Sequence, residues 1–236
     1  MKEKMRINKY LSSIGVASRR EIDRLVEKGS IKVNGAIATP GMQVSESDTI
    51  EINGKKFRKN RGKVYFMLYK PTGVISAAKD DRGRKTVVDL VKYQERIYPV
   101  GRLDFDTEGL ILLTNDGDFF NKIMHPKSEV YKEYHVDVMG KVNKLEIDKL
   151  KRGVRLEDGI TLPAKVELLD SSHETSKLRI SIREGRNRQI RRMCKAVGHP
   201  VTHLKREKIG ELSLGRLKKG GFRELSKKEI EYLYSL

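Results

Sequence analysis

The spacing of apolar residues changes near residue 62, and this change constrains the fold more than any other feature of the sequence. Before it, apolar residues recur at the spacing of one helical face, at Ile7, Tyr10, Leu11 and Ile14. A second helix is indicated by the capping-box pair Ser18 and Glu21, and Gly29 ends its apolar pattern. Alternating stretches around Asn34-Gly35 and Asn53-Gly54 then predict tight hairpins. The start of the chain is therefore predicted to form two short helices and a small sheet.

The longer remainder mixes strand and helix periods. Strands are predicted over residues 64–69, 109–114, 131–138, 164–169 and 177–183. Helices are predicted between them, from Asp118 to Met124, from Asn143 to Lys151 and from Asn187 to Val197. Because regular βαβ alternation is missing, the fold class is predicted to be α+β.

A charged run, KKFRKNRGK, separates the two parts and is too polar to bury. We therefore expect a small domain over residues 1–58, a linker over 59–62 and a larger domain over 63–236.

The charge balance indicates a polyanionic partner. The chain has 50 Lys and Arg against 32 Asp and Glu, a formal charge of +18, and nucleic acid is the leading candidate for such a protein. The surplus is concentrated in residues 178–223, which hold 14 basic and 3 acidic side chains.

Three further observations narrow the class of protein. The single cysteine, Cys194, excludes an intrachain disulfide and a thiolate-rich zinc site, and it fits a reducing cytoplasm. No window approaches the ~18 consecutive apolar residues of a membrane span, so a soluble protein without a membrane partner is expected. His199 and His203 have helical metal-ligand spacing, but Pro200 lies between them and no third ligand is evident. No metal site is therefore expected.

The segment PVGRLDFDTEGLILLTNDG places carboxylates directly before an apolar strand. Asp104 could cap a turn, pair locally with Arg102 or simply be solvated. The alternative is functional, because a loop that enters a buried strand would hold the carboxylate at the mouth of a sheet.

The segment EGRNRQIRRMCKAVGHP predicts a helix that is apolar on one face and cationic on the other. The cationic face carries Arg188, Arg191, Arg192 and Lys195. Such a face is commonly just solvated. Because the helix itself contains no carboxylate to pair with these side chains, we instead expect an external anion, of which phosphate is the natural candidate.

Together these strings resemble the RsuA/RluB-type ribosomal RNA pseudouridine synthases. GRLDFDTEGLILLTNDG is similar to the catalytic motif of that family, and KEYHV and EGRNRQIRRM are similar to its second and third motifs. The N-terminal SRREIDRLVEKGSIKVNG resembles the alpha-L RNA-binding module that precedes the catalytic domain. The resemblance implies a mixed, mainly antiparallel catalytic sheet with flanking helices, and no cofactor.

The resemblance also implies roles for individual residues. Asp104 matches the catalytic aspartate, and Tyr134 matches the tyrosine that packs on the target base. Arg191 matches the arginine that pairs with the aspartate, and Arg102 matches a residue linked to displacing the base from its stack. RNA contacts are expected from two sets of cations: Arg19, Arg20, Arg24 and Lys32 in the first domain, and Arg186, Arg188, Arg192 and Lys195 around the basic helix.

The expected activity is isomerisation of one uridine of ribosomal RNA to pseudouridine by a cytoplasmic monomer. The string GVRLEDGITLPAKV and the N-terminal module look closest to the large-subunit RluB-type members, and this resemblance implies 23S RNA as the substrate, either free or in a ribosome-assembly intermediate. Two alternatives stay open: the same chemistry on 16S or transfer RNA, and a non-catalytic RNA-binding ribosome-assembly factor.

Overall fold

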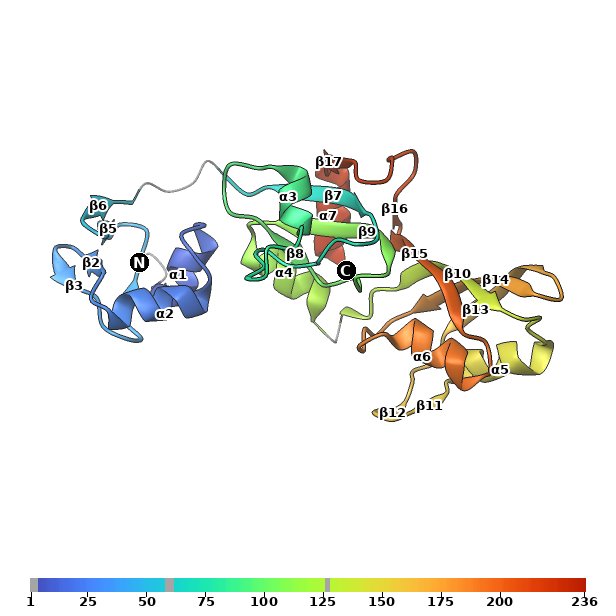
Figure 1. Ribbon diagram of the computed structural model, residues 1–236. Coiled ribbons are helices and arrows are strands. Elements are labelled where there is room, and N and C mark those ends of the chain that lie inside the picture. Colours follow the sequence, from blue (N-terminus) through green and yellow to red (C-terminus); the bar gives the residue numbers. More distant parts are fainter. Residues whose placement is uncertain (1–3, 58–61, 126–127) are drawn as a thin grey trace.

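The computed structural model describes residues 4–57, 62–125 and 128–236. Of the predicted linker, residues 59–61 lie outside this described part. Figure 1 shows the N-terminal elements gathered at one end of the molecule and the remaining elements around a long sheet. No helix in the described ranges is both long enough and apolar enough to cross a membrane.

The N-terminal domain has the two helices and the small sheet that the sequence predicts. Helices α1 (Ile7–Ser13) and α2 (Arg19–Glu27) pack together, and Ser18 caps α2 by accepting a hydrogen bond from the Glu21 N–H. A four-stranded sheet has the order β3-β2-β5-β6, with bounds Ala36–Ile37, Ile31–Val33, Ile50–Ile52 and Lys55–Lys56. Strands β1 (Met5–Arg6) and β4 (Gln43–Val44) form a separate pair. Apolar side chains from both helices and the sheet share one core.

The larger domain is built on a nine-stranded sheet whose main order is β13-β14-β10-β15-β9-β7-β17. Its central strands are β10 (Lys132–Met139), β15 (Val201–Ile209), β9 (Glu108–Thr114) and β7 (Tyr65–Lys70). Its outer strands are β13 (Lys165–Ser171), β14 (Thr175–Ile182) and β17 (Phe222–Glu224), while β8 (Tyr98–Val100) pairs with β9 and β16 (Leu212–Ser213) with β15. Every pairing is antiparallel except that of β15 with β9. The expected mixed, mainly antiparallel sheet is confirmed.

The parallel contact between β9 and β15 is unusually close. A Cβ atom at Gly109, whose φ is +121°, would lie 2.2 Å from the Arg206 carbonyl oxygen. Only glycine fits there, since a side chain would collide with backbone and the φ angle is unfavourable for other residues. This contact fixes the start of β9, which directly follows residues 101–107, against β15 in the middle of the sheet.

Helices cover the two faces of the sheet and create two cores. On one face, α3 (Val87–Val91), α5 (Lys144–Arg152) and α6 (Gln189–Ala196) contribute apolar side chains to a cluster that includes Ile111, Val136 and Leu204. Figure 1 shows α5 and α6 together beside β10, β13 and β14. On the other face, α4 (Gly117–Met124) and α7 (Lys227–Ser235) cover Leu110 and Leu112. A short hairpin, β11 (Arg155–Leu156) and β12 (Gly159–Ile160), contacts α6.

The predicted strands and helices are present, with corrections at two helix starts. Asp116 rather than Asp118 caps α4, because its side chain accepts from the Asp118 N–H. Asn187 does not cap α6: the N-cap residue is Arg188, at φ +48°, and it makes no capping hydrogen bond through its side chain. The sequence analysis also missed β15, whose apolar alternation is interrupted by two register shifts against β10 and by the buried Arg206.

Candidate active site

The loop of residues 101–107 is held from below by buried polar groups. The Lys70 ammonium donates to the carbonyl oxygens of Asp104 at 3.0 Å and Thr107 at 2.7 Å, and also to that of Pro71. The Ser76 hydroxyl donates to the Leu103 carbonyl at 2.8 Å and accepts from the Leu103 N–H at 3.0 Å. The backbone on both sides of Asp104 is therefore fixed by side chains of other segments.

Lys70 is a component of the site that the sequence analysis missed. It is fully buried, and this burial lowers its pKa to about 8 even though the nearby Asp104 and Asp106 charges favour the ammonium form. A signal was available in the sequence, since Lys70 ends the otherwise apolar stretch of β7. A lysine at such a position is buried only when acceptors surround it, as these carbonyl groups do.

Asp104 sits at the first position of a tight turn, and its carboxylate is left free. The turn is closed by a hydrogen bond from the Thr107 N–H to the Asp104 carbonyl, 3.1 Å. Asp104 is half-buried, and within the described ranges its carboxylate has no hydrogen bond or ion pair. The charges of Lys70 and Arg188 nevertheless interact with it. The turn thus presents a carboxylate that has no hydrogen bond or ion pair within the described ranges, with two cations nearby.

Arg191 contacts the loop at Asp106 rather than at Asp104, the partner that the resemblance implied. Its Nη2 donates to the Asp106 carbonyl at 2.8 Å, and its Nε lies 3.3 Å from Asp106 Oδ2 without hydrogen-bond geometry. Arg188 binds the same carboxylate through both of its terminal nitrogens, at 3.0 and 2.9 Å. The hydrogen bond from Arg188 is the main cause of the lowered pKa of Asp106. Asp106 therefore links the loop to the start of α6, two residues from Asp104.

Tyr134 lies on the face of β10 that contributes to the α5 and α6 core. Its ring belongs to the same apolar cluster as Leu103 and Ile190, and only 9% of the residue is exposed. Its hydroxyl makes no hydrogen bond to a described residue. Leu103 and Ile190 are the immediate neighbours of Arg102-Asp104 and Arg191 in the chain. The three segments that carry the predicted catalytic residues therefore each contribute a side chain to the same core, while Arg102 itself is exposed.

Glu108 anchors the far end of the loop. Its carboxylate accepts hydrogen bonds from the Tyr69 hydroxyl at 2.9 Å and from Lys219, and it lies 3.2 Å from His203 Nε2. Burial acts to raise the pKa of Glu108, but these donors outweigh it and the pKa is lowered. Glu108 is thus a structural carboxylate. It lies on the opposite face of the sheet from the Tyr134 ring, because Leu110 and Tyr69, which lie beside it, belong to the core on that opposite face.

The basic face of α6 has acidic partners, so the expectation that it requires an external anion is wrong. Arg192 binds both oxygens of Asp158 at 2.9 Å, and Arg186 lies 3.5 Å from the same carboxylate. Arg186 also donates to the backbone carbonyls of residues 158–160 in the β11–β12 hairpin. The sequence of the helix could not show this, because the neutralising carboxylates come from the loop of residues 101–107 and from the hairpin. Lys195 is exposed and has no ion pair among the described residues.

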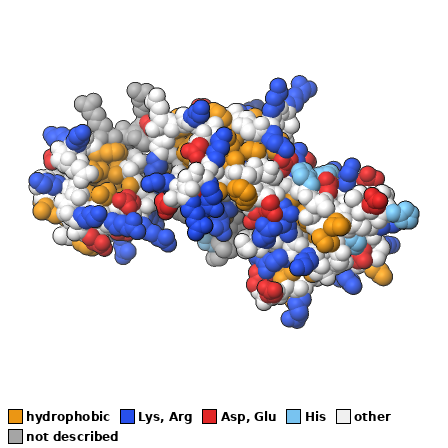
Figure 2. Space-filling view, viewed as in Figure 1, with side chains coloured by type: hydrophobic (Ala, Val, Ile, Leu, Met, Phe, Trp, Pro, Cys, Tyr) orange, Lys and Arg blue, Asp and Glu red, His pale blue; other side chains and the backbone are white. Residues whose placement is uncertain are grey.

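The cations predicted in the N-terminal domain are all exposed. Arg19, Arg20, Arg24 and Lys32 lie on α2 and β2 with their side chains in solvent. Figure 2 shows a band of Lys and Arg side chains along the edge of this domain where α2 lies. The only ion pair of α2 in the described ranges joins Arg24 to Glu21, with side chains 69% and 48% exposed.

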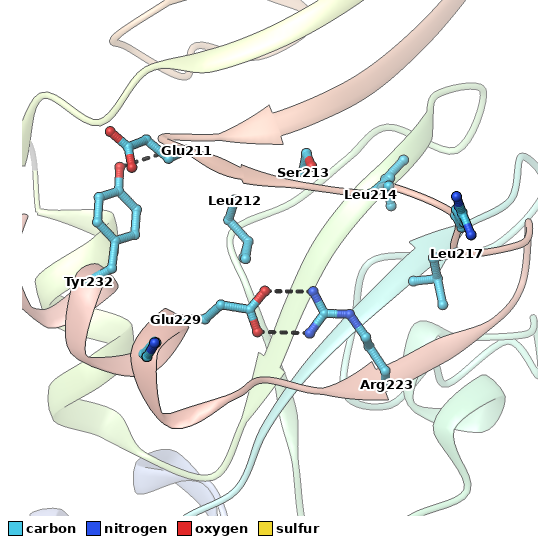
Figure 3. Close-up of a pocket in the computed structure, with 11 residues that line it drawn as sticks. Glu211, Leu212, Ser213, Leu214, Leu217, Arg223, Glu229 and Tyr232 are labelled. Carbon is cyan, nitrogen blue, oxygen red and sulfur yellow. Dashed lines mark hydrogen bonds and ion pairs between the residues drawn. The ribbon is translucent and has the colours of Figure 1, made fainter.

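A separate cavity of about 670 Å³ lies beside the C-terminal segment, between β16, the following loop and α7. Figure 3 shows that an ion pair between Arg223 and Glu229 crosses it and that the Tyr232 hydroxyl accepts from the Glu211 N–H. None of Asp104, Tyr134 or Arg191 lines this cavity. In the described part of the chain, no three or more His, Cys, Asp or Glu residues are grouped so that they could hold a metal ion. His199 instead contacts the Met139 carbonyl and Glu146.

Comparison with known proteins places this geometry in a family. The family model described as RNA pseudouridylate synthase matches residues 64–196, and the S4 domain model matches residues 5–50. Ribosomal large subunit pseudouridine synthase B of Bacillus subtilis is 52% identical over 98% of this chain and 96% of that protein. The dual-specificity RNA pseudouridine synthase RluF of Escherichia coli is 38% identical, over 98% and 79% of the two chains.

A solved structure agrees with the sequence relatives. The crystal structure of a pseudouridylate synthase superposes with a TM-score of 0.72 at 32% identity, covering 97% of this chain and 99% of that one. The S4 match corresponds to the RNA-binding module inferred at the N-terminus. With an S4 domain, a matching synthase domain and the Asp104 loop in place, this chain belongs to the RNA pseudouridine synthase family.

Proposed function

We propose that this pseudouridine synthase modifies a uridine of 23S ribosomal RNA, with Asp104 as its catalytic carboxylate. The substrate is supported by the name and the 52% identity of the Bacillus subtilis relative. The role of Asp104 is supported by one observation above all: a free carboxylate at the first position of a turn whose backbone is locked by Lys70. Residues 63–236 carry out the reaction, and residues 1–58 bind structured RNA.

The reaction rearranges one nucleotide without adding or removing atoms. The N1–C1′ glycosidic bond breaks, the base turns, C1′ bonds to C5, the C5 proton leaves and N1 gains a proton. A carboxylate assists by adding at C1′ or at C6, or by stabilising the charge that develops as the base departs. Asp104 suits each route because its oxygens are not engaged by neighbouring side chains of the described structure.

We assign the other steps, which are base stacking, proton transfer and base displacement, to residues around Asp104. Tyr134 offers a ring fixed in the core and a free hydroxyl, which fits packing on the uracil and proton transfer at C5. Arg188 and Arg191, joined through Asp106, keep positive charge close to the turn that carries Asp104. We assign to the exposed Arg102 the position that the uridine leaves in the stack, an event that costs a few kcal/mol.

Pseudouridine formation by the Asp104→Asn variant tests the catalytic assignment. Release of tritium from RNA labelled at C5 of uridine measures the loss of the C5 hydrogen directly. We expect Asp104→Asn to bind RNA with unchanged affinity and to release no tritium, whereas Asp118→Asn, an exchange of the same kind on α4, retains full activity. Normal tritium release by Asp104→Asn would refute the role of this carboxylate.

The substrate is tested by mapping pseudouridines, through carbodiimide modification and reverse transcription, in cells with and without the gene. We expect one site in 23S RNA to disappear. Loss of a site in 16S or transfer RNA would change the substrate, and an unchanged map would favour a non-catalytic assembly factor.

Comparing free 23S RNA with assembly intermediates as substrates in vitro tests the stage of action, and sedimentation tests the proposed monomer. Fractionation tests the proposed cytoplasmic location.

A further inference from the structure

Phe105, the residue between Asp104 and Asp106, is an aromatic side chain exposed beside the catalytic carboxylate. It is 56% exposed. The other exposed phenylalanine of the described chain, Phe222, is 43% exposed and has its ring 6.0 Å from that of Phe66. Phe105 belongs to none of the apolar clusters and has no ring partner among the described residues. An isolated apolar side chain on a surface needs no special explanation, so its setting decides whether it has a role.

The backbone around Phe105 is held too firmly for the ring to fold back into the core. Its carbonyl accepts a hydrogen bond from the Gly73 N–H at 2.9 Å. The carbonyls on either side, those of Asp104 and Asp106, accept from Lys70 and Arg191 at 3.0 and 2.8 Å. Three consecutive carbonyl groups are therefore fixed, two of them by residues 70–73 and the third by α6. The exposure of Phe105 is a property of a rigid turn that presents the ring to solvent next to Asp104.

The surroundings fit RNA rather than an apolar partner. Arg102 is exposed two residues before Asp104, and Arg188, with its side chain 45% exposed, lies on the other side of the turn. Cations beside a single exposed aromatic ring match the combination that binds unpaired nucleic acid, in which phosphates meet the cations and a base stacks on the ring. An apolar protein partner would instead bury several neighbouring apolar side chains, and the residues beside Phe105 are charged.

We propose that Phe105 stacks on a base adjacent to the target uridine and so holds the RNA open at the modified position. The inference rests on the proposed function, because removing the uridine from its stack leaves the neighbouring base without a partner on that side. A planar ring fixed one residue from Asp104 supplies a stacking surface for the base on one side of the uridine, while Arg102, assigned above to the vacated position, faces the base on the other side. Because every base has a flat face, the contact contributes affinity with little dependence on the identity of that base.

The test measures equilibrium binding of a stem-loop RNA that carries the mapped uridine, with the full chain in an Asp104→Asn background so that the RNA stays unmodified. Phe105→Ala is compared with Phe105→Tyr, which keeps the ring, and with Leu145→Ala, a control at a 72% exposed apolar residue on α5. Loss of one stacked base corresponds to about a 5- to 150-fold weaker affinity. We expect this loss in Phe105→Ala, and a change below about threefold in the other two variants. Thermal unfolding confirms that all variants fold.

A second RNA set identifies what the ring contacts. An abasic residue placed on the 5′ or the 3′ side of the uridine removes the base but keeps the phosphates. If Phe105 stacks there, one of the two abasic RNAs binds the protein that retains Phe105 and the Phe105→Ala variant with equal affinity. Unchanged affinity in Phe105→Ala, or the same loss on both abasic RNAs, overturns the proposal. A loss seen only with ribosomal particles overturns it in favour of a protein contact. Failure of the proposed function is distinguishable, because the wild-type chain would then form no pseudouridine whatever the binding results.

Discussion

The cations of α2 and those around the loop of residues 101–107 look alike in the sequence but have opposite surroundings. On α2, Arg19 and Arg20 are exposed and have no ion pair in the described part of the chain. Around the loop, Lys70 is fully buried on backbone carbonyls, and the Arg191 side chain is only 13% exposed. Clusters of positive charge in one protein can therefore serve two purposes, contact with an external polyanion and construction of a site.

The difference has a physical consequence for how each region responds to its environment. Exposed charges act through solvent and are screened by salt, with a screening length of about 8 Å at physiological ionic strength. The charges on Lys70 and Arg191 are held at fixed hydrogen-bond distances and are screened much less. We therefore expect the α2 cations to control RNA affinity and its salt dependence, and the loop cations to control turnover and stability.

Among changes to the cations of the two regions, the largest expected effect comes from Arg191→Met. The change removes the donor to the Asp106 carbonyl and the charge beside Asp106, so the turn that presents Asp104 loses its contact with α6. We expect the single-turnover rate at saturating RNA to fall by about 100-fold, the scale for removing one preorganised donor from an active site. RNA affinity should change by less than about threefold, as measured by filter binding.

Lys149→Met, at an exposed lysine of α5, is the matched control for Arg191→Met and should keep the wild-type rate. If Arg191→Met weakens RNA binding as strongly as it slows turnover, Arg191 belongs with the α2 cations and the comparison between the two regions fails.

The next effect is a pH dependence of stability that originates at Lys70. Burial lowers its pKa to about 8 in the folded chain, below the ordinary value of 10.5. Between these values the unfolded chain binds more protons at this side chain than the folded chain does, so the free energy of unfolding gains a contribution that rises with pH. Below pH 8 both states are protonated and the contribution is constant.

Lys70→Met removes this titration. Chemical denaturation of both proteins from pH 7 to 10.5 should show the stability of the wild type rising relative to that of Lys70→Met, by about 3 kcal/mol if the full shift is realised. The same comparison with Lys149→Met should give a constant difference. A wild-type stability that falls relative to Lys70→Met over this range would mean that the carbonyl acceptors hold the ammonium more strongly than burial opposes it.

Much of the architecture could be predicted because it depends on local patterns. The Asn143 cap of α5 and the strand before Asn115 follow from residue types and period alone. The three segments predicted to carry the site each contribute a side chain, Leu103, Tyr134 and Ile190, to one core, and their catalytic roles stay a prediction. A core of this sort is expected wherever apolar faces of successive elements pack on one sheet.

The contacts that the sequence could not supply are those between distant segments. Asp106 and Asp158 neutralise the arginines of α6 across separations of 82 and 34 residues. Lys70 supports a loop that lies 34 residues away. Helical spacing within residues 189–196 contains no information on these partners, so the sequence alone predicts a basic face without acidic partners. Charge pairing of this kind is set by tertiary structure.

The double variant Arg20→Ala with Arg24→Ala tests whether the exposed cations of α2 bind RNA. If each arginine contacts one phosphate, the slope of log K against log salt should become shallower by about 0.7 to 0.9 for each. The turnover rate at saturating RNA should stay unchanged. Lys144→Ala with Lys149→Ala removes the same charge from α5 and should leave the slope close to that of the wild type. An unchanged slope in the α2 variant would place its arginines outside the RNA contact.

The smallest expected effect comes from Asp158→Asn. This variant tests whether arginines that are paired within the protein can become available to bind RNA. Arg186 and Arg192 are 24% and 27% exposed, so they could reach a phosphate once the Asp158 charge is removed. We expect RNA affinity at low salt to rise by about threefold with a steeper salt slope, because an internal anion no longer competes for the two guanidinium groups. Glu157→Gln removes the same charge from the neighbouring residue, which forms no ion pair in the described structure, and so reports the long-range contribution alone. A weaker affinity in Asp158→Asn would instead show that the hairpin orients these arginines toward the RNA, in which case pairing and binding cooperate rather than compete.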